Sequence, residues 1–128
     1  MPRTEWGWQV TAEELAAWII QHDSDLLVLN KPGLVVCHPS KHGPWSSLIG
    51  ACREYLGDAT LHMPSRLDRE TSGVIVFART REMGSRLQKA VQARQVSKSY
   101  LAILEGTLAE AVCVDQPIGC LLYTSRCV

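Results

Sequence analysis

The sequence predicts an α+β fold in which a mixed, largely antiparallel sheet is flanked by helices. Short apolar runs recur along the chain, and several are separated by turns too short to hold a crossover helix, which favours antiparallel strands. Two other stretches, residues 11–21 and 80–93, have patterns typical of helices. The chain has 128 residues, of which 46% are hydrophobic and 20% charged, as expected for one ordinary domain with a single core.

The first predicted elements are a short helix and a strand. Residues 11–21 are assigned to the helix because Thr11 is followed three residues later by Glu14, which is the pattern of a capping box. A turn rich in Asp and Ser then leads to residues 26–29, whose sequence Leu-Leu-Val-Leu predicts a strand.

The next elements follow a tight turn. Residues 30–33 contain Pro and Gly and end the first strand, after which residues 34–37 are predicted to form another. Residues 38–44 read as a loop. Apolar side chains at helical spacing then predict a helix over residues 45–55, capped near Ser46–Ser47.

The second half of the chain also contains predicted strands and a predicted helix. Residues 74–78 form an apolar, β-branched run that predicts a buried strand. In the helix predicted over 80–93, the apolar residues form one stripe that is expected to face the sheet. Further strands are predicted over 98–106 and from 111 to 114, whereas residues 120–128 show no clear period.

Bulk composition excludes several classes of protein. The start of the chain does not resemble a signal peptide, and the apolar runs are too short to cross a bilayer, so a cytoplasmic protein is expected. Five cysteines without a C-x-x-C pair support neither a disulfide framework nor a zinc site, and buried reduced thiols are expected. Because His38 and His42 lie in a segment with Pro and Gly, they are not expected to bind a metal.

The segment from Arg66 to Gly73 reads R-L-D-R-E-T-S-G and precedes the strand predicted over 74–78. Asp68 lies between Arg66 and Arg69, which are expected to hold its carboxylate in the ionised form. Two interpretations are open. The cluster is a surface ion-pair network, or Asp68 is a catalytic carboxylate on a loop carried by a rigid sheet.

Positive charge is concentrated in residues 79–98, which carry a net charge of plus five although the whole chain is neutral. This window is either a solvated helix face or a track for a polyanion such as RNA. Lys98 and Tyr100 are two residues apart, so in a strand they would lie on the same face. The cations of the window before Lys98 are Arg79, Arg81, Arg86, Lys89 and Arg94.

Three separated segments resemble the RluA-type pseudouridine synthases, enzymes that isomerise uridine in structured RNA. Residues 25–39, D-L-L-V-L-N-K-P-G-L-V-V-C-H-P, are similar to an early strand-KPxG-strand segment, one residue shorter around Gly33. Residues 66–73 are similar to the motif H-R-L-D-x-x-T-S-G, and residues 98–106 resemble a basic-x-Tyr motif followed by a strand. The order and spacing of the three segments agree with the family.

The resemblance implies a role for each matching residue. Asp68 would be the catalytic aspartate, Lys98 its charge partner, and Tyr100 the phenol that packs against the target base. Arg66 would reach into the RNA where that base has left the stack. Arg69 and the five cations of the basic window would bind RNA phosphates. The reaction requires no metal and no cofactor, and the partner would be rRNA or tRNA.

Two departures from the family pattern affect these expectations. Ser65 stands where the motif usually has His, and residues 120–128 do not match the expected continuation. We therefore expect residues 1–22 to be a short helical extension and residues 23–128 to be the N-terminal part of a catalytic domain, incomplete at its C-terminus and monomeric when complete. Two alternatives to an active isomerase are an RNA-binding fragment without turnover and, less favoured, a metal-dependent hydrolase with Asp68 as nucleophile.

Overall fold

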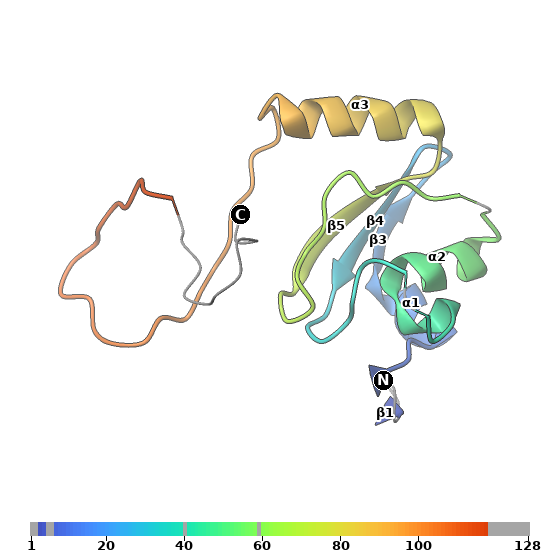
Figure 1. Cartoon of the computed structure of the whole chain (residues 1–128), viewed down its shortest axis with the longest axis horizontal. Coiled ribbons are helices and arrows are strands. Elements are labelled where there is room, and N and C mark those ends of the chain that lie inside the picture. Colours follow the sequence, from blue (N-terminus) through green and yellow to red (C-terminus); the bar gives the residue numbers. More distant parts are fainter. Residues whose placement is uncertain (1–2, 5–6, 40, 59, 118–128) are drawn as a thin grey trace. The chain divides into compact units, whose positions relative to one another are not determined.

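The computed structural model describes residues 3–4, 7–39, 41–58 and 60–117. The chain divides into two units, Met1–Ser97 and Lys98–Val128, and each is described by itself. All helices and strands of the described residues belong to the first unit (Figure 1). In chain order they are β1 (Arg3–Thr4), β2 (Gly7–Trp8), α1 (Ala12–Trp18), β3 (Ile19–His22), β4 (Leu26–Lys31), the 3-10 helix η1 (Pro44–Ser46), α2 (Leu48–Leu56), β5 (Gly73–Ala78) and α3 (Arg81–Gln92).

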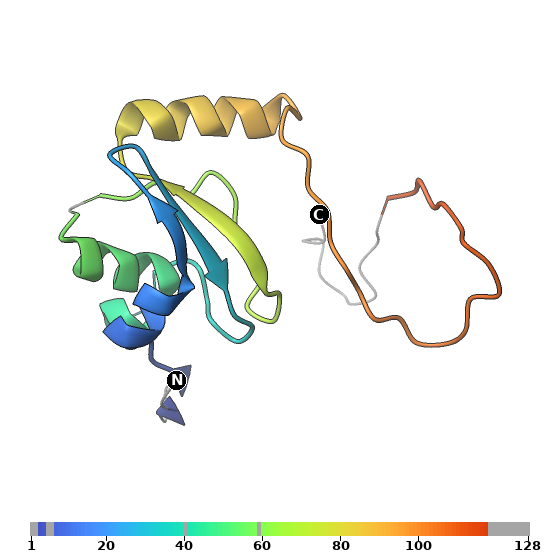
Figure 2. The ribbon, with the colours of Figure 1, turned by 180° about the vertical axis from the view of Figure 1, so that it is seen from behind.

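The main sheet is antiparallel and has the strand order β3-β4-β5 (Figure 2). Strands β4 and β5 pair along their whole length, from Leu26 opposite Ala78 to Lys31 opposite Gly73. A separate pair of short strands, β1 and β2, precedes α1. The helices, together with this antiparallel sheet, confirm the predicted α+β class.

The hydrophobic core lies on one face of the main sheet. Alternate residues of β4 and β5 point into it, as expected for strands with one buried face. Leu15 of α1 and several residues of α2 join the same cluster, so these two helices cover this face. The sheet and helices contribute Leu15, Leu27, Leu29, Leu48, Ile49, Ala51, Cys52, Ile75 and Phe77.

Three helix predictions are confirmed, with two boundaries corrected. The helix predicted over residues 45–55 begins at Leu48, because Pro44–Ser46 form the 3-10 helix η1. The predicted capping box of α1 is present, because Thr11 accepts from the backbone N–H of Glu14 and the Glu14 carboxylate accepts from that of Thr11. This helix ends at Trp18 rather than at residue 21. Residues 19–22 instead form β3, where the partner strand β4 takes their backbone hydrogen bonds.

Helices α2 and α3 begin at side-chain caps. Ser47 accepts from the backbone N–H of Gly50, and Thr80 accepts from that of Met83. The apolar stripe of α3 is half-buried, and the helix packs beside β5.

The prediction of a strand over residues 34–37 is wrong. Leu34 has a positive φ of 74°, which is incompatible with a strand. The carbonyls of Val36 and Cys37 accept from the backbone N–H groups of Leu48 and Ile49, at 2.8 and 3.1 Å. The segment therefore satisfies the first N–H groups of α2, which have no partner within the helix.

The strands predicted over 98–106 and 111–114 are also absent from the described part of the second unit. Every described residue there is exposed, and Leu101 and Ile103 have essentially the exposure of an extended chain. An alternating sequence forms a strand only beside a neighbour that takes its backbone hydrogen bonds, and no backbone partner is present within residues 98–117.

The cysteines divide by environment. Cys37 and Cys52 are buried thiols, as predicted, whereas Cys113 is exposed. Burial raises the pKa of the Cys52 thiol to about 12. No helix in the described portion of the chain is both long and apolar enough to span a bilayer.

Candidate active site

A fully buried lysine links two of the three sequence segments. Lys31 ends β4, and its side chain has no exposed surface. Its Nζ donates to the backbone carbonyls of Pro32 and Val35, both at 2.9 Å, and to that of Arg69 at 3.1 Å. Three ammonium donors thus meet three carbonyls. Lys31 joins the turn after β4 to the loop that carries Asp68.

Burial and nearby negative charge have opposite effects on the pKa of Lys31. Desolvation lowers the pKa of the Lys31 ammonium below its ordinary value. The negative charges of Glu70 and Asp68 oppose this shift, because negative charge favours the protonated amine.

Backbone contacts strengthen the same junction. Leu34 donates its N–H to the Arg69 carbonyl at 2.6 Å, and the Cys37 thiol donates to the Leu67 carbonyl at 3.2 Å. Gly33 lies so close that an added Cβ would be 3.1 Å from the Glu70 carbonyl oxygen. The turn after β4 and the loop before β5 therefore lie side by side (Figure 1).

Asp68 is exposed at the end of this junction. Its carbonyl accepts from the N–H of Thr71 at 3.1 Å, which closes a turn directly before β5. Leu67 packs against the core beside it. The loop is therefore anchored by Lys31, Cys37 and Leu67, while the carboxylate faces solvent. Such an arrangement presents a charged group on a fixed backbone.

The ion pairs predicted for Asp68 are not found. Arg69 pairs with Glu70 instead, at 3.2 Å between Nε and Oε1, and both side chains are largely exposed. Among the described residues, no ion pair joins Asp68 to Arg66 or to Arg69. Side chains of residues that are close in sequence can point in different directions on an exposed loop. Closeness in sequence therefore did not determine which ion pairs form. The Asp68 carboxylate remains available to a ligand.

The predicted basic residues differ in their surroundings. Arg66 and Arg69 are exposed on the Asp68 loop, and Arg81, Arg86, Lys89 and Arg94 are exposed on or just after α3. Arg79 instead binds the Asp58 carboxylate with two nitrogens, at 2.8 and 3.1 Å, and donates to the Asp23 carbonyl at 2.7 Å. The hydrogen bonds that Arg79 donates to the Asp58 carboxylate raise the pKa of the guanidinium. Because Arg79 binds both Asp58 and Asp23, it holds two loops of the fold together.

Lys98 and Tyr100 lie in the second unit and are exposed there. Their position at Asp68 stays a prediction. Ser65, at the motif position usually held by His, is half-buried just before Arg66. Within the described ranges, no group of three or more His, Cys, Asp or Glu side chains could hold a metal ion.

Sequence reasoning did not identify Lys31 and Cys37 as residues that hold the loop. A signal was present for Lys31, because it follows Leu27 and Leu29 at intervals of two and so shares their buried face. Cys37 carried no comparable signal, since its partner is 30 residues away.

Comparison with known proteins identifies the family. The family model described as "RNA pseudouridylate synthase" matches residues 25–120, which include all three motif segments. The chain belongs to the RNA pseudouridylate synthase family. The resemblance inferred from the three segments is thereby confirmed.

Similar members of the RNA pseudouridylate synthase family come from bacteria. A protein named ribosomal large subunit pseudouridine synthase D from Yersinia pestis is 33% identical over 112 residues, which cover 84% of this chain and 34% of that protein. The protein of the same name from Vibrio vulnificus is 34% identical over 112 residues, with the same coverage. The chain spans about a third of the length of these curated relatives.

A solved structure supports the same family. Human RNA pseudouridylate synthase domain containing 4 superposes with a TM-score of 0.55 at 28% sequence identity, covering 66% of this chain and 33% of that one. The α+β arrangement is therefore that of a pseudouridine synthase domain.

Proposed function

We propose that this chain carries the catalytic aspartate and part of the RNA-binding surface of an enzyme that isomerises uridine to pseudouridine in RNA. The observation that carries this proposal is the Asp68 loop, in which a family motif is anchored by a buried lysine and contains an exposed carboxylate. We infer that residues 23–128 correspond to the N-terminal part of the catalytic domain, preceded by a short segment whose helix α1 and strand β3 pack against its core and its sheet.

The chemistry suits an exposed carboxylate on a fixed loop. Breaking the bond between N1 of uracil and C1′ of ribose leaves positive charge at C1′ and gives the bonding electron pair to the base. Asp68 either attacks C1′, forming an ester bond that breaks when C5 of the base bonds to C1′, or stabilises the positive charge while the C2′ proton is removed and later returned to C2′. The freed uracil turns, C5 forms the new bond to C1′, C5 loses its proton, and N1 ends protonated.

Lys98 and Tyr100 are proposed to complete the site. Lys98 would balance the charge of Asp68, and the Tyr100 phenol would pack against the base and assist proton transfer. Arg66 would occupy the space that the flipped base leaves in the RNA. Flipping costs a few kcal/mol, which phosphate and stacking contacts must supply.

The phosphate contacts are proposed to come from exposed cations on the Asp68 loop and on α3. Those residues are Arg66, Arg69, Arg81, Arg86, Lys89 and Arg94. The relatives' names point to large-subunit ribosomal RNA as the first substrate to test, with tRNA as the second.

Replacing the proposed catalytic group tests the function. Asp68→Asn is expected to reduce pseudouridine formation on ribosomal RNA by at least about a thousandfold, because the amide can neither attack C1′ nor balance its charge. RNA affinity should stay nearly unchanged. The matched control is Asp25→Asn, an exposed aspartate in the turn before β4. Turnover by Asp68→Asn close to that of the control would reject the assignment.

A second candidate function is RNA binding without turnover. It is favoured by the six exposed cations on the Asp68 loop and on or just after α3, which can bind phosphates without any catalytic step. It predicts no pseudouridine from the unsubstituted chain, together with RNA affinity that falls steeply as salt rises. Product formation by the unsubstituted chain decides between the two candidates.

A further inference from the structure

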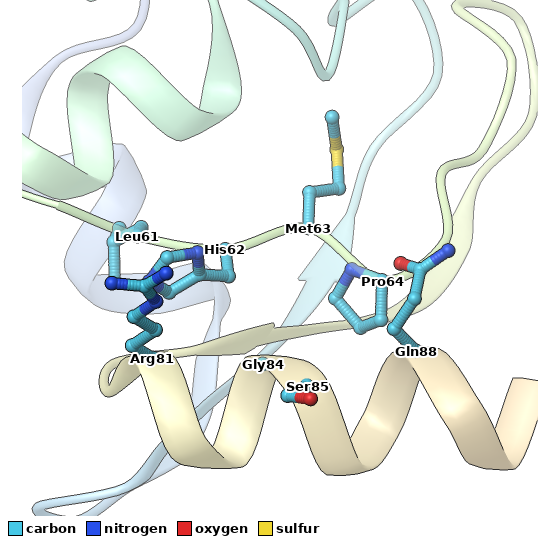
Figure 3. A pocket seen from close by; sticks show the side chains of 8 residues that line it. All are labelled: Leu61, His62, Met63, Pro64, Arg81, Gly84, Ser85 and Gln88. Atoms are coloured by element: carbon cyan, nitrogen blue, oxygen red, sulfur yellow. The ribbon is translucent and has the colours of Figure 1, made fainter.

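A groove separate from the Asp68 loop runs between α3 and the segment at residues 61–64 (Figure 3). Its volume is about 440 Å³. Arg81 and His62 lie toward one end, and Pro64 and Gln88 lie toward the other. Ser85 also lines it. On α3, positions 81, 84, 85 and 88 share one face, so a single helix surface forms this wall.

Gly84 allows the two walls to approach. An added Cβ at this buried position would be 2.9 Å from both Cβ and Cγ of His62, closer than such atoms pack. The opposite wall is fixed to the sheet, because the backbone N–H and C=O of His62 pair with those of Ala78 at 2.9 and 2.8 Å. The groove is therefore a preformed feature between a helix and a strand-like segment.

The position of the groove separates it from the proposed chemistry. His62 and α3 lie at the Ala78 end of β5, whereas the Asp68 loop precedes its Gly73 end. Six residues of strand place these ends roughly 17 Å apart. RNA bound in the groove would therefore be a segment that flanks the reacting uridine.

The lining combines the groups that recognise a nucleotide. The exposed Arg81 guanidinium suits a phosphate, because it presents several donors in one plane. Ser85 and Gln88 can donate to and accept from the edge of a base, and the Pro64 ring offers an apolar surface beside them. Exposed Arg86 and Lys89 continue the positive charge along the helix. Charge and lining together favour an RNA strand over an apolar ligand.

We propose that this groove binds one nucleotide of a single-stranded RNA segment, with the phosphate on Arg81 and the base against Gln88, Ser85 and Pro64. The choice of RNA rests on the proposed function. The groove itself is tested by binding and not by turnover, so the two proposals can fail separately.

Two matched pairs of variants on α3 test the groove in the full chain. Arg81→Gln and Arg86→Gln each remove one exposed arginine, but only Arg81 lines the groove. Gln88→Leu and Gln92→Leu form the second pair, of which only Gln88 lines it. The probe is a short, labelled, single-stranded oligouridylate, and its dissociation constant is measured at several salt concentrations.

We expect Arg81→Gln to weaken binding about tenfold and more than Arg86→Gln does. Gln88→Leu is expected to weaken it about fivefold, with little effect of Gln92→Leu. Equal effects of the two variants within each pair would overturn the proposal. A general electrostatic surface would respond alike to a substitution inside the groove and to one outside it. Failure of oligouridylate to bind the unsubstituted chain would overturn it as well.

Photo-crosslinking provides an independent measurement. Oligonucleotides containing 4-thiouridine are expected to crosslink to peptides that contain residues 61–64 or 81–88. Crosslinks confined to other peptides would overturn the groove proposal while leaving the proposed isomerase intact. Polyglutamate serves as a second polyanion. If Gln88→Leu weakened polyglutamate binding as much as RNA binding, the groove would be an anion surface without nucleotide recognition.

Discussion

At the residue scale, the unusual feature is a buried lysine that acts through backbone carbonyls. Burying an ammonium is costly unless its donors are satisfied, and Lys31 satisfies all three within the protein. One of these hydrogen bonds goes to the carbonyl of Arg69, the residue next to Asp68. Lys31 is therefore a positioning residue for the proposed catalytic loop, and its ammonium is not available to a phosphate.

Removing this ammonium tests its positioning role. Lys31→Met keeps the side-chain length but leaves three carbonyls without their donor, so the free energy of unfolding should fall by about 3 kcal/mol. Urea unfolding measures this change. Lys41→Met, at an exposed lysine, is the control and should change stability by less than about 0.5 kcal/mol. Equal stability of the two variants would contradict the role assigned to Lys31.

At the element scale, the N-terminus of α2 organises the junction. Its first N–H groups donate to Val36 and Cys37, and Cys37 in turn donates to Leu67. The start of the helix is therefore connected by hydrogen bonds to the loop that carries Asp68. This connection also explains why residues 34–37 are not a strand.

Gly50 allows α2 to pack against the preceding 3-10 helix η1. An added Cβ there would overlap the carbonyl oxygen of Pro44 and lie 2.9 Å from its Cα, atoms that cannot rotate away. Gly50→Ala gains about 1 kcal/mol of helix propensity but forces this backbone apart, which typically costs about 1–3 kcal/mol or more. We expect a net loss of stability in thermal unfolding. Glu54→Ala, on the exposed side of α2, is the control, and a Gly50→Ala variant as stable as this control would refute the packing argument.

Local patterns predicted the elements whose signals lie within a few residues. The capping box at Thr11 and the β-branched run before Ala78 both have this property, and both predictions are confirmed. The prediction that Asp68 forms ion pairs was wrong, because the side chain of Arg69 pairs with Glu70 instead. Side-chain partners on an exposed loop follow from rotamers, which adjacency in sequence does not determine.

At the scale of the whole molecule, order is concentrated in the first unit. Residues 1–97 contain the sheet, the helices and the buried core, whereas the described part of the second unit is exposed and contains no helix or strand. Exposed backbone without cooperative hydrogen bonds opens at little cost in free energy.

Limited proteolysis distinguishes the two units. Chymotrypsin under native conditions should cut first after Tyr100, Leu101 or Leu104, because these residues are exposed on an extended backbone. Phe77, which is fully buried in β5, should be cut only after denaturation. Mass spectrometry of the first products measures the order. Early cleavage at Phe77 would contradict a stable first unit.

The sequence by itself determined the α+β class, the N-terminal caps of α1 and α2 and the place of Asp68 shortly before a strand. These features depend on propensities and spacings over a few residues. Tertiary structure alone decided that Lys31 contacts Arg69, 38 residues away, and that His62 and Gly84 bound a groove. Such contacts arise when packing brings distant segments together, and no local pattern specifies which buried donor will meet which carbonyl.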